Sequence, residues 1–453
     1  MAAERPPNIV FILADDLGWK DVGYQGSDFM ETPNIDQLAR EGMVFTAGYS
    51  NAGNCVPSRA CLLSGNYTPR HDVYAVGSTN RGPKREMRLL PIPGKTGLSK
   101  TNFTMAKALK AAGYATGIFG KWHLDGASGS LPSQHGFDTV YQSNQSWESR
   151  DPQNPKGIYS LTQGACNFME ANKSRPFFVY LPHYAIHIGL QSRPSSLAKF
   201  NAKTPGAQHN NPLYAACTYD LDNGVGILLK KIADLDLENN TLVVFSSDNG
   251  GSNSSQEPLR GNKGCYFEGG IREPFIVRWP GVTTPGTHCD VPVIMVDLYP
   301  TFLAAANTAA PADKILDGEN LRPLLTGSGP LQRQSIFWHF PGYLDNPVTR
   351  GRPLDVRTGF RTRPVSVIHK GDWKLHLYIE EWQLDGGRDK LATNNAVELY
   401  NLKDDIGERN NLANVNTAKR DELLNELLAW HQSVHAKLPY KPNPLYAPAA
   451  AMH

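Results

Sequence analysis

Short apolar runs alternate with helical patterns along the first three-quarters of the chain. Residues 8–14 form a continuous apolar run, which is typical of a strand buried on both faces. The segment after Thr32 predicts a helix that this threonine caps, with Pro33 at its first position and Gly42 at its end. Such alternation predicts an α/β fold in which helices flank a large, mostly parallel sheet.

The same patterns predict the remaining elements and a division of the chain. Helices are expected at residues 104–112 and 213–235, and buried strands at 115–119, 176–181, 242–246 and 275–279. After a Gly-Ser-Gly-Pro joint, shorter strands are expected at 336–340, 365–369, 373–378 and 397–401, and a closing helix at 418–435. We therefore expect an α/β domain over residues 7–335 and a smaller α+β subdomain with an antiparallel sheet over 336–453.

The composition of the chain argues against some classes of binding partner. Over 453 residues, 45 Lys and Arg balance 43 Asp and Glu, so no bulk charge favours nucleic acid or an anionic membrane. No apolar run is long enough to span a bilayer. The first apolar run follows Glu4 and Arg5 and lacks the layout of a secretory signal. We expect a periplasmic or secreted protein whose signal peptide is missing from this chain, with a cytoplasmic location as the alternative.

Acidic side chains follow two of the predicted buried strands. Asp15 and Asp16 come directly after the first strand, and Asp248 and Asn249 follow the strand at 242–246. Alone, either pair would be a turn or a helix cap. In open α/β sheets, however, ligands bind beyond the carboxyl ends of the strands. These oxygen donors together predict a site for Ca²⁺ or Mg²⁺.

Basic and histidine side chains are expected at the same edge of the sheet. Lys121 and His123 follow one strand, and residues two apart in an extended segment share a face. His183 and His187 follow another strand, and Lys263 lies in a glycine-rich stretch. Singly, each is more often a surface lysine or a buried histidine. With the carboxylates, they predict a site for a tetrahedral oxyanion, at which histidine moves protons.

Cys55 stands at the predicted start of a helix that runs through Leu63, with Pro57 in its first turn. Backbone N–H groups at such an N-terminus favour an anion. The alternative is an inert buried thiol. A cysteine phosphatase loop, which places Arg six positions after Cys, is excluded because Arg59 comes too early and position 61 is Cys61.

Nine short strings carry a resemblance to a known family. They are Ala14-Asp15-Asp16, Cys55-Val56-Pro57-Ser58-Arg59-Ala60, Leu63-Ser64-Gly65, Gly120-Lys121-Trp122-His123-Leu124, Ser247-Asp248-Asn249-Gly250-Gly251, Arg260-Gly261-Asn262-Lys263-Gly264, Glu268-Gly269-Gly270-Ile271-Arg272, Gly371-Asp372-Trp373-Lys374-Leu375 and Glu398-Leu399-Tyr400-Asn401-Leu402. Together they resemble the type I formylglycine-dependent sulfatases of the alkaline phosphatase superfamily, and among them carbohydrate sulfatases. The resemblance runs from about residue 7 to 415.

The resemblance implies a sulfuric ester hydrolase whose nucleophile is made after translation. A formylglycine-generating enzyme would convert Cys55 to formylglycine, an aldehyde that hydrates to a gem-diol. One hydroxyl would attack sulfur and displace the alcohol, and the other would then expel sulfate. The residues that the resemblance assigns to the cation, Ca²⁺ with Mg²⁺ as the alternative, are Asp15, Asp16, Cys55, Asp248 and Asn249.

The resemblance also assigns roles in the reaction. Arg59 and Lys121 would steady the diol and the sulfate, and His123 would help to deprotonate the diol. Lys263 and His187 would face the bridging oxygen, with His187 as the acid for the leaving group and His183 as the alternative.

The expected substrate is a sulfated saccharide or polysaccharide. The segment 338–343 resembles a block of carbohydrate sulfatases and places His339 among the candidate sugar contacts, although an edge strand is an equal alternative. Arg361 and Arg363 are candidates for binding further sulfates, or are solvated or salt-bridged, and His183 is a further candidate for contact with the substrate. The alternative functions are a formylglycine-dependent phosphonate monoester or phosphodiester hydrolase, an arylsulfatase for small non-carbohydrate esters, and a non-catalytic glycan-binding relative.

Overall fold

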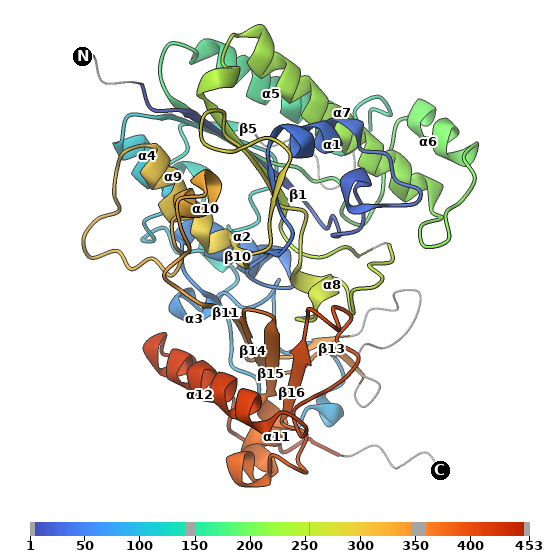
Figure 1. Cartoon of the computed structure of the whole chain (residues 1–453), viewed down its shortest axis with the longest axis vertical. Coiled ribbons are helices and arrows are strands. Elements are labelled where there is room, and N and C mark those ends of the chain that lie inside the picture. Colours follow the sequence, from blue (N-terminus) through green and yellow to red (C-terminus); the bar gives the residue numbers. More distant parts are fainter. Residues whose placement is uncertain (1–4, 142–149, 253, 346–358, 448–453) are drawn as a thin grey trace.

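A mixed sheet of eight strands forms the centre of the larger part of the molecule, in the upper half of Figure 1. The structure, a computed structural model, describes residues 5–141, 150–252, 254–345 and 359–447. In spatial order the strands are β5 (Thr139–Tyr141), β4 (Ala115–Phe119), β6 (Phe177–Pro182), β1 (Asn8–Ala14), β7 (Thr241–Ser247), β8 (Ile276–Arg278), β2 (Met43–Phe45) and β9 (Thr287–Cys289). All neighbouring strands are parallel except at β8, which is antiparallel to both β7 and β2. The expected mostly parallel sheet is confirmed.

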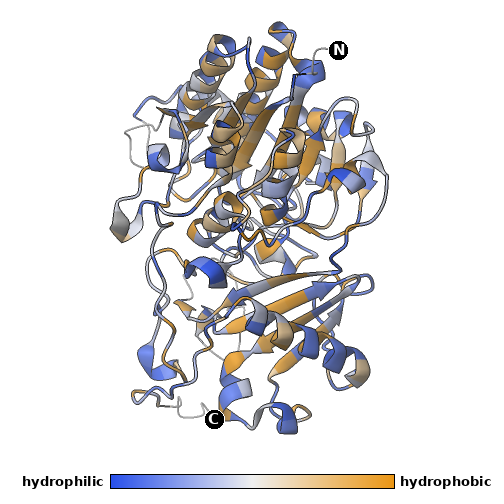
Figure 2. Ribbon diagram, turned by 90° about the vertical axis from the view of Figure 1, so that its left-hand side faces the viewer, coloured by the Kyte–Doolittle hydropathy of each residue, from blue (hydrophilic) through white to orange (hydrophobic). Residues whose placement is uncertain are grey.

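Helices cover both faces of this sheet (Figure 1). One layer contains α1 (Pro33–Glu41), α5 (Ile158–Ala171), α6 (Pro194–Asn201) and α7 (Pro212–Asp234). The other contains α2 (Cys55–Ser64), α4 (Met105–Ala111), α9 (Leu298–Ala305) and α10 (Arg322–Thr326). Successive side chains of β1 enter opposite cores, because Phe11 packs in one hydrophobic cluster and Val10 and Ile12 in the other. The central strands are accordingly mostly apolar, as the orange in the sheet of Figure 2 shows.

A second, antiparallel sheet forms the lower part of the molecule (Figure 1). Its strands, in order, are β11 (Ser335–Phe340), β14 (Val365–Lys370), β15 (Trp373–Tyr378) and β16 (Val397–Asn401). The closing helix α12 (Thr417–Ser433) packs on one face of this sheet. The other face is turned towards the large part, since Trp338 of β11 donates a hydrogen bond to the backbone carbonyl of Ser50 at 2.8 Å. The expected smaller antiparallel sheet with one packed helix is confirmed.

Short elements complete the two parts. They are β3 (Gly48–Tyr49), α3 (Thr68–His71), α8 (Glu268–Ile271), β10 (Val293–Ile294), β12 (Leu344–Asp345), β13 (Phe360–Thr362) and α11 (Ile379–Leu384). Within the described residues, none of the helices combines the length and the apolar character that crossing a bilayer requires.

The helix start at Pro33 differs from expectation in one detail. The hydroxyl of Thr32 makes no capping bond to the helix backbone. It donates instead to the carboxylate of Asp36 at 2.9 Å and accepts from the backbone N–H of Gly23 at 2.8 Å. The threonine therefore ties the preceding loop to the helix and does not cap it.

Candidate active site

The carboxyl ends of four adjacent strands carry most of the predicted site residues, and α2 and the coil before α8 supply Cys55, Arg59 and Lys263. These strands, β4, β6, β1 and β7, are neighbours in the sheet. Backbone hydrogen bonds join the loops that follow them: Lys121 N–H donates to Pro182 O at 2.7 Å, and Asp15 N–H donates to Ala185 O at 2.9 Å. Asp248 N–H likewise donates to Ala14 O at 3.2 Å. The site is thus built on rigid strand ends, as expected for an open α/β sheet.

The acidic residues and Cys55 converge on one point. One potential ligand atom from each of Asp15, Asp16, Cys55 and Asp248 lies within 4.8 Å of all the others. The amide nitrogen of Asn249 donates to Asp16 at 2.8 Å, so this side chain belongs to the same cluster. Its amide oxygen is buried and accepts no hydrogen bond from the described residues. A free oxygen acceptor beside three carboxylates is a donor set that suits a hard cation.

Three cationic side chains pair with the three carboxylates. Lys121 lies 2.7 Å from Asp15 and Arg59 lies 2.7 Å from Asp248, and all four side chains are buried. Burial by itself would raise the pKa of Asp15, but Lys121 and Arg59 hold it well below its usual range. For Asp248 burial prevails, and its pKa rises to about 6. Buried charge of this kind lowers the stability of the fold unless a bound ligand compensates it.

Lys263 and His187 approach the remaining carboxylate from outside. The ammonium of Lys263 lies 2.7 Å from Asp16, and Nε2 of His187 lies 3.8 Å from the same side chain. Both are partly accessible, whereas Asp16 is buried. Burial lowers the pKa of His187, and Asp15 and Asp16 oppose that shift. These two side chains are therefore placed to meet the outer end of a ligand.

His123 lies beside the inner cations. It is half-buried, and its backbone adopts a left-handed φ of 60°. Burial, followed by the nearby charges of Lys121 and Arg59, lowers the pKa of His123 to about 3. The imidazole is therefore neutral near pH 7 and is able to accept a proton. A non-glycine residue with positive φ is uncommon, and such conformations cluster at functional sites.

Cys55 is the first residue of α2 and is 1% exposed. Burial raises the pKa of its thiol to about 11, although Lys121 and Lys263 act against that shift. At neutral pH the side chain is thus a protonated thiol. Because the thiolate is the nucleophilic form, an unmodified Cys55 would be a poor nucleophile here.

His183 does not share the site with His187. It follows β6 directly, is fully buried, and packs against α7, where a Cβ at Gly224 would lie 3.9 Å from its ring. Neither ring nitrogen has a hydrogen-bond partner in the described structure. Its pKa is lowered to about 3 by burial alone. We therefore withdraw His183 and retain His187.

Two further predicted substrate contacts, His339 and Arg363, are also withdrawn. His339 pairs with Ser366 across β11 and β14, and its ring binds Ser366 Oγ at 2.8 Å and the carbonyl of Lys437 at 3.1 Å. It therefore lies on the α12 face of the sheet, whereas its neighbour Trp338 faces Ser50. Strand alternation separates the two, so the aromatic and the histidine cannot form one surface.

Arg363 is a structural cation. Its guanidinium forms ion pairs with Glu380 and Glu381 and lies 4.1 Å from the centre of the Tyr378 ring. The side chain is 2% exposed, which leaves no surface for a sugar sulfate. The salt-bridged alternative given for this residue is the one observed.

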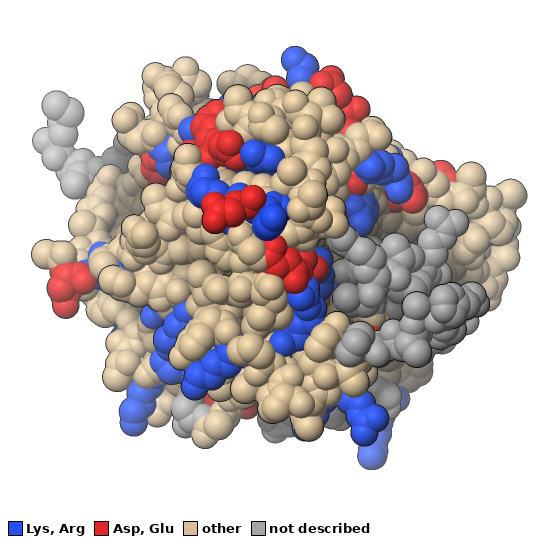
Figure 3. All heavy atoms as spheres, turned by 90° about the horizontal axis from the view of Figure 1, so that it is seen from below, with Lys and Arg blue, Asp and Glu red and all other residues tan. Residues whose placement is uncertain are grey.

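Arg361 lies beside the site. Its guanidinium donates to the backbone carbonyl of Lys263 at 3.0 Å, and its side chain covers Gly264. It is partly exposed, unlike Arg363. On the face in Figure 3, lysines and arginines lie among acidic residues in the upper part and gather with few acidic residues beside them in the lower part.

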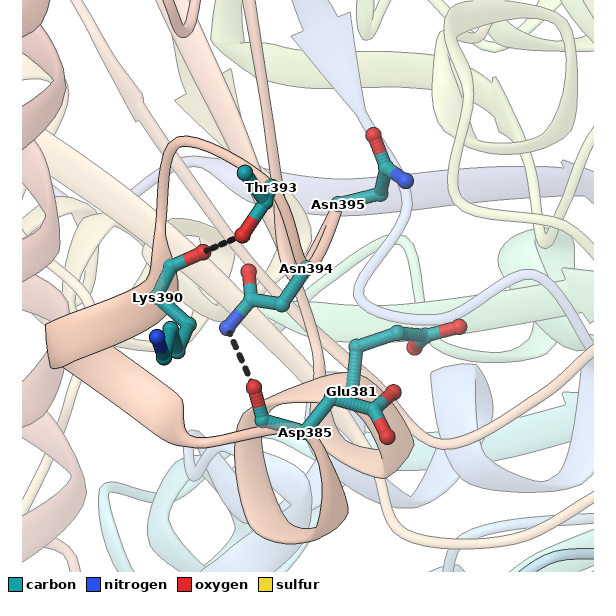
Figure 4. Close-up of a pocket in the computed structure, with 6 residues that line it drawn as sticks. All are labelled: Glu381, Asp385, Lys390, Thr393, Asn394 and Asn395. Carbon is teal, nitrogen blue, oxygen red and sulfur yellow. Dashed lines mark hydrogen bonds between the residues drawn. The ribbon is translucent and has the colours of Figure 1, made fainter.

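A polar pocket of about 540 Å³ lies in the C-terminal part of the chain, and residues between 381 and 395 line it (Figure 4). It is lined by Glu381, Asp385, Lys390, Thr393, Asn394 and Asn395. None of the predicted site residues contributes to it, and it holds no basic cluster for an oxyanion. The strand-end site is therefore the better candidate.

Comparison with known proteins agrees with this geometry. The sequence model of the sulfatase family matches residues 7–308. The chain belongs to the sulfatase family. A second model, described as the C-terminal part of N-sulphoglucosamine sulphohydrolase, matches residues 262–370. The protein is accordingly a sulfuric ester hydrolase, of a family whose members carry a metal ion and a formylglycine.

Individual relatives cover most of the chain. N-acetylgalactosamine-6-sulfatase from Canis lupus familiaris is 34% identical over 74% of this chain and 69% of its own length. Human arylsulfatase A is 32% identical over 91% of this chain and 84% of its own. Among solved structures, Ps i-CgsB in complex with k-i-k-neocarrahexaose has a TM-score of 0.77 at 27% identity, covering 96% of this chain and 95% of that one.

Proposed function

We propose that this sulfatase hydrolyses sulfate esters of a saccharide or polysaccharide, with a formylglycine made from Cys55 as its nucleophile. The observation that carries the mechanism is the convergence of Cys55 with Asp15, Asp16 and Asp248 within 4.8 Å, each carboxylate paired with a cation. A site of this charge and burial suits a small tetrahedral oxyanion next to a metal ion.

The residues present fit a divalent cation, and we propose Ca²⁺. The holders would be Asp15, Asp16, Asp248, Asn249 and residue 55. The fit rests on the unpartnered amide oxygen of Asn249 and on the carboxylate oxygens beside it. An all-oxygen set favours Ca²⁺ or Mg²⁺ over a thiophilic metal. When bound, the ion would neutralise charge on the sulfate oxygens and lower the pKa of an adjacent hydroxyl.

A formylglycine at position 55 would supply two hydroxyls in its hydrated form, one to attack sulfur and one to allow sulfate release. Arg59 and Lys121 would offset the negative charge on the sulfate, since both lie buried within the cluster. His123, neutral near pH 7, would accept a proton from the second hydroxyl. A protonated thiol would not supply these two hydroxyls, and this supports the proposal that Cys55 is converted.

The leaving alcohol would be met by His187 and Lys263. Both approach Asp16 from the accessible side of the site. We propose that His187 donates the proton to the bridging oxygen from its protonated form, which the nearby Asp15 and Asp16 favour against the effect of burial. Lys263 would stabilise the negative charge that develops there.

The saccharide substrate is suggested by the relatives and by Arg361. One relative is named for N-acetylgalactosamine 6-sulfate, and one similar structure holds a neocarrahexaose. Arg361, partly exposed beside Lys263, would contact a further anionic group of such a substrate. We further propose that the catalytic domain spans residues 7–335 and the C-terminal subdomain spans 336–453. A formylglycine-generating enzyme would convert Cys55, and the protein would act in the periplasm or outside the cell.

Two measurements test the proposal. Mass spectrometry of the tryptic peptide that ends at Arg59 should show formylglycine at position 55 in protein co-expressed with a converting enzyme. A substrate panel should show the highest kcat/KM on sulfated saccharides, lower values on aryl sulfates, and the lowest on phosphate and phosphonate esters. Cys61→Ala, on the same helix, is the control and should keep its activity. An unmodified thiol in the fully active enzyme would overturn the mechanism.

A further inference from the structure

A buried ion cluster lies between the C-terminal sheet and the segment that carries Lys263. Lys374 of β15 lies 2.8 Å from Glu268 and 3.1 Å from Glu408, and all three side chains are fully buried. Arg272 and the hydroxyl of Tyr49 each lie 2.9 Å from the second oxygen of Glu268. We call Glu268, Arg272, Lys374 and Glu408 the coil anchor.

The coil anchor contacts the backbone as well as the side chain of Glu268. One oxygen of Glu408 accepts the backbone N–H of Glu268 at 2.6 Å. Its other oxygen lies 2.9 Å from the ring of His376, the next residue of β15 on the same face as Lys374. The start of α8 is therefore held by the C-terminal part from two directions.

The coil between residues 260 and 270 is packed so tightly that a shift of Glu268 would displace its neighbours. A Cβ at Gly269 would come within 2.2 Å of the carbonyl of Gly261, and a Cβ at Gly250 within 2.2 Å of the carbonyl of Gly269. The N–H of Gly264 donates to Gly53 O at 2.6 Å. Such close backbone packing transmits a displacement to neighbouring residues.

Both ends of this coil reach the candidate active site. The N–H of Lys263 donates to Gly251 O at 3.0 Å, and its ammonium lies 2.7 Å from Asp16. At the other end, Gly250, which follows Asn249, donates its N–H to Gly270 O at 3.0 Å. The coil thus supports one residue proposed to face the leaving oxygen and one proposed to hold the cation.

We propose that Lys374 is a positioning residue for sulfate ester hydrolysis: through Glu268 and Glu408 it fixes the coil that orients Lys263 and supports Asn249. The inference rests on the proposed function of those two residues. It gives the C-terminal part a role in the reaction, although Lys374 itself touches neither substrate nor cation. Because an error of about 1 Å in a positioned group can lower a rate about 100-fold, the effect should appear in kcat.

The test compares Lys374→Met with a control variant, Leu427→Ala, that is expected to lose a similar amount of stability. Leu427→Ala removes core volume from α12, on the opposite face of the same sheet, without touching the coil anchor. Both variants should lower Tm by several degrees. At a temperature where each is folded, K374M should lower kcat about 10- to 100-fold with KM within about threefold, and L427A should leave both near wild type.

A second variant and a substrate-free measurement keep the inference testable if K374M folds poorly. Lys374→Met combined with Glu268→Gln removes one buried charge of each sign and leaves the nearby opposite charges of Arg272 and Glu408, so part of the lost Tm should return. The value of kcat should stay low because the anchor is broken. Hydrogen exchange should become faster in residues 261–272 of both K374M proteins and not in L427A. This readout needs no turnover, so it separates this inference from the proposed function.

Three results would overturn the inference. They are a wild-type kcat in folded K374M, a recovery of kcat together with Tm in the double variant, and unchanged exchange over residues 261–272. If the wild-type protein failed to turn over any sulfate ester while the exchange result held, the proposed function would fail and the structural support of the coil would stand.

Discussion

Two clusters of buried charge in this protein differ in whether every buried polar group has a partner. At the strand ends, burial raises the pKa of Asp248 to about 6, and the amide oxygen of Asn249 lacks a partner among the described residues. In the coil anchor, burial would raise the pKa of Glu268, but Lys374 and Arg272 lower it to about 2. The carboxylates of both clusters are buried, yet only the second set is fully paired by the side chains around it.

The difference separates a site from its support. A buried carboxylate that its neighbours do not fully stabilise is expected where a ligand completes the arrangement. A balanced set of ion pairs instead fixes the geometry of the backbone that it joins, and losing one partner leaves an uncompensated charge. We therefore assign binding and chemistry to the first cluster and positioning to the second.

The largest effect is expected from Cys55→Ala. Without a precursor for the nucleophile, kcat/KM should fall at least about 10⁴-fold, as for other enzymes that lose the attacking group. Steady-state kinetics on the preferred sulfated saccharide measures the loss, and circular dichroism checks that the fold is kept. Appreciable turnover by folded C55A would show that the strand-end cluster works through another nucleophile.

Removal of metal should affect the strand-end cluster and leave the coil anchor intact. Prolonged chelation should abolish most of the activity and lower Tm by a few degrees, since a ligand at 100 times its Kd stabilises by about 2.7 kcal/mol. Adding Ca²⁺ should restore both. Asp248→Ala, which lacks one proposed ligand, should show no change of Tm with chelator. A wild-type Tm indifferent to chelator and Ca²⁺ would contradict a cation site here.

Acid should weaken the coil anchor. Because the folded-state pKa of Glu268 lies below its ordinary 4.5, its contribution is fully present above pH 4.5 and is lost as pH falls towards 2. The difference in free energy of unfolding between wild type and Glu268→Gln should thus be largest near pH 7 and shrink by about 3 kcal/mol at low pH. Urea unfolding at several pH values measures it.

A surface ion pair serves as the control for that profile. Glu422, which pairs with Lys419 on α12 and with Lys370 of β14, is 42% exposed to water. Glu422→Gln should change stability by at most about 1 kcal/mol at any of these pH values. A pH-independent effect of E268Q would mean that Glu268 supports the coil by shape and not by charge.

The smallest effect is expected at Arg361, beside the site but outside both clusters. Arg361→Gln should raise KM for a polysulfated oligosaccharide about 3- to 10-fold and leave a small aryl sulfate within about twofold, since a partly exposed charge pair contributes about 1 kcal/mol. Arg388→Gln, far from Lys263 in the sequence and exposed, is the control. Equal effects on both substrates would remove Arg361 from saccharide recognition.

Long, strongly patterned elements could be predicted from the sequence, and short ones could not. The limits of β1, β4, β15 and β16 agree with the expected ranges to the residue. Strands of two residues, such as β3 and β10, contain too little of a period-2 pattern to be recognised, whereas the three-residue β8 was predicted as part of the apolar run at 275–279. Helix α5 was not expected either, although its apolar face packs in the same hydrophobic cluster as Val10 and Ile12.

What the sequence determined by itself was the chemistry of the site: residue types, their places after buried strands, and the strings around Cys55. The tertiary structure decided which of two histidines reaches Asp16 and which face of β11 meets the large domain. It also revealed Lys374, whose partner Glu268 is 106 residues away in sequence. Periodicity predicts that a strand has two faces, but only packing between distant segments determines what each face meets.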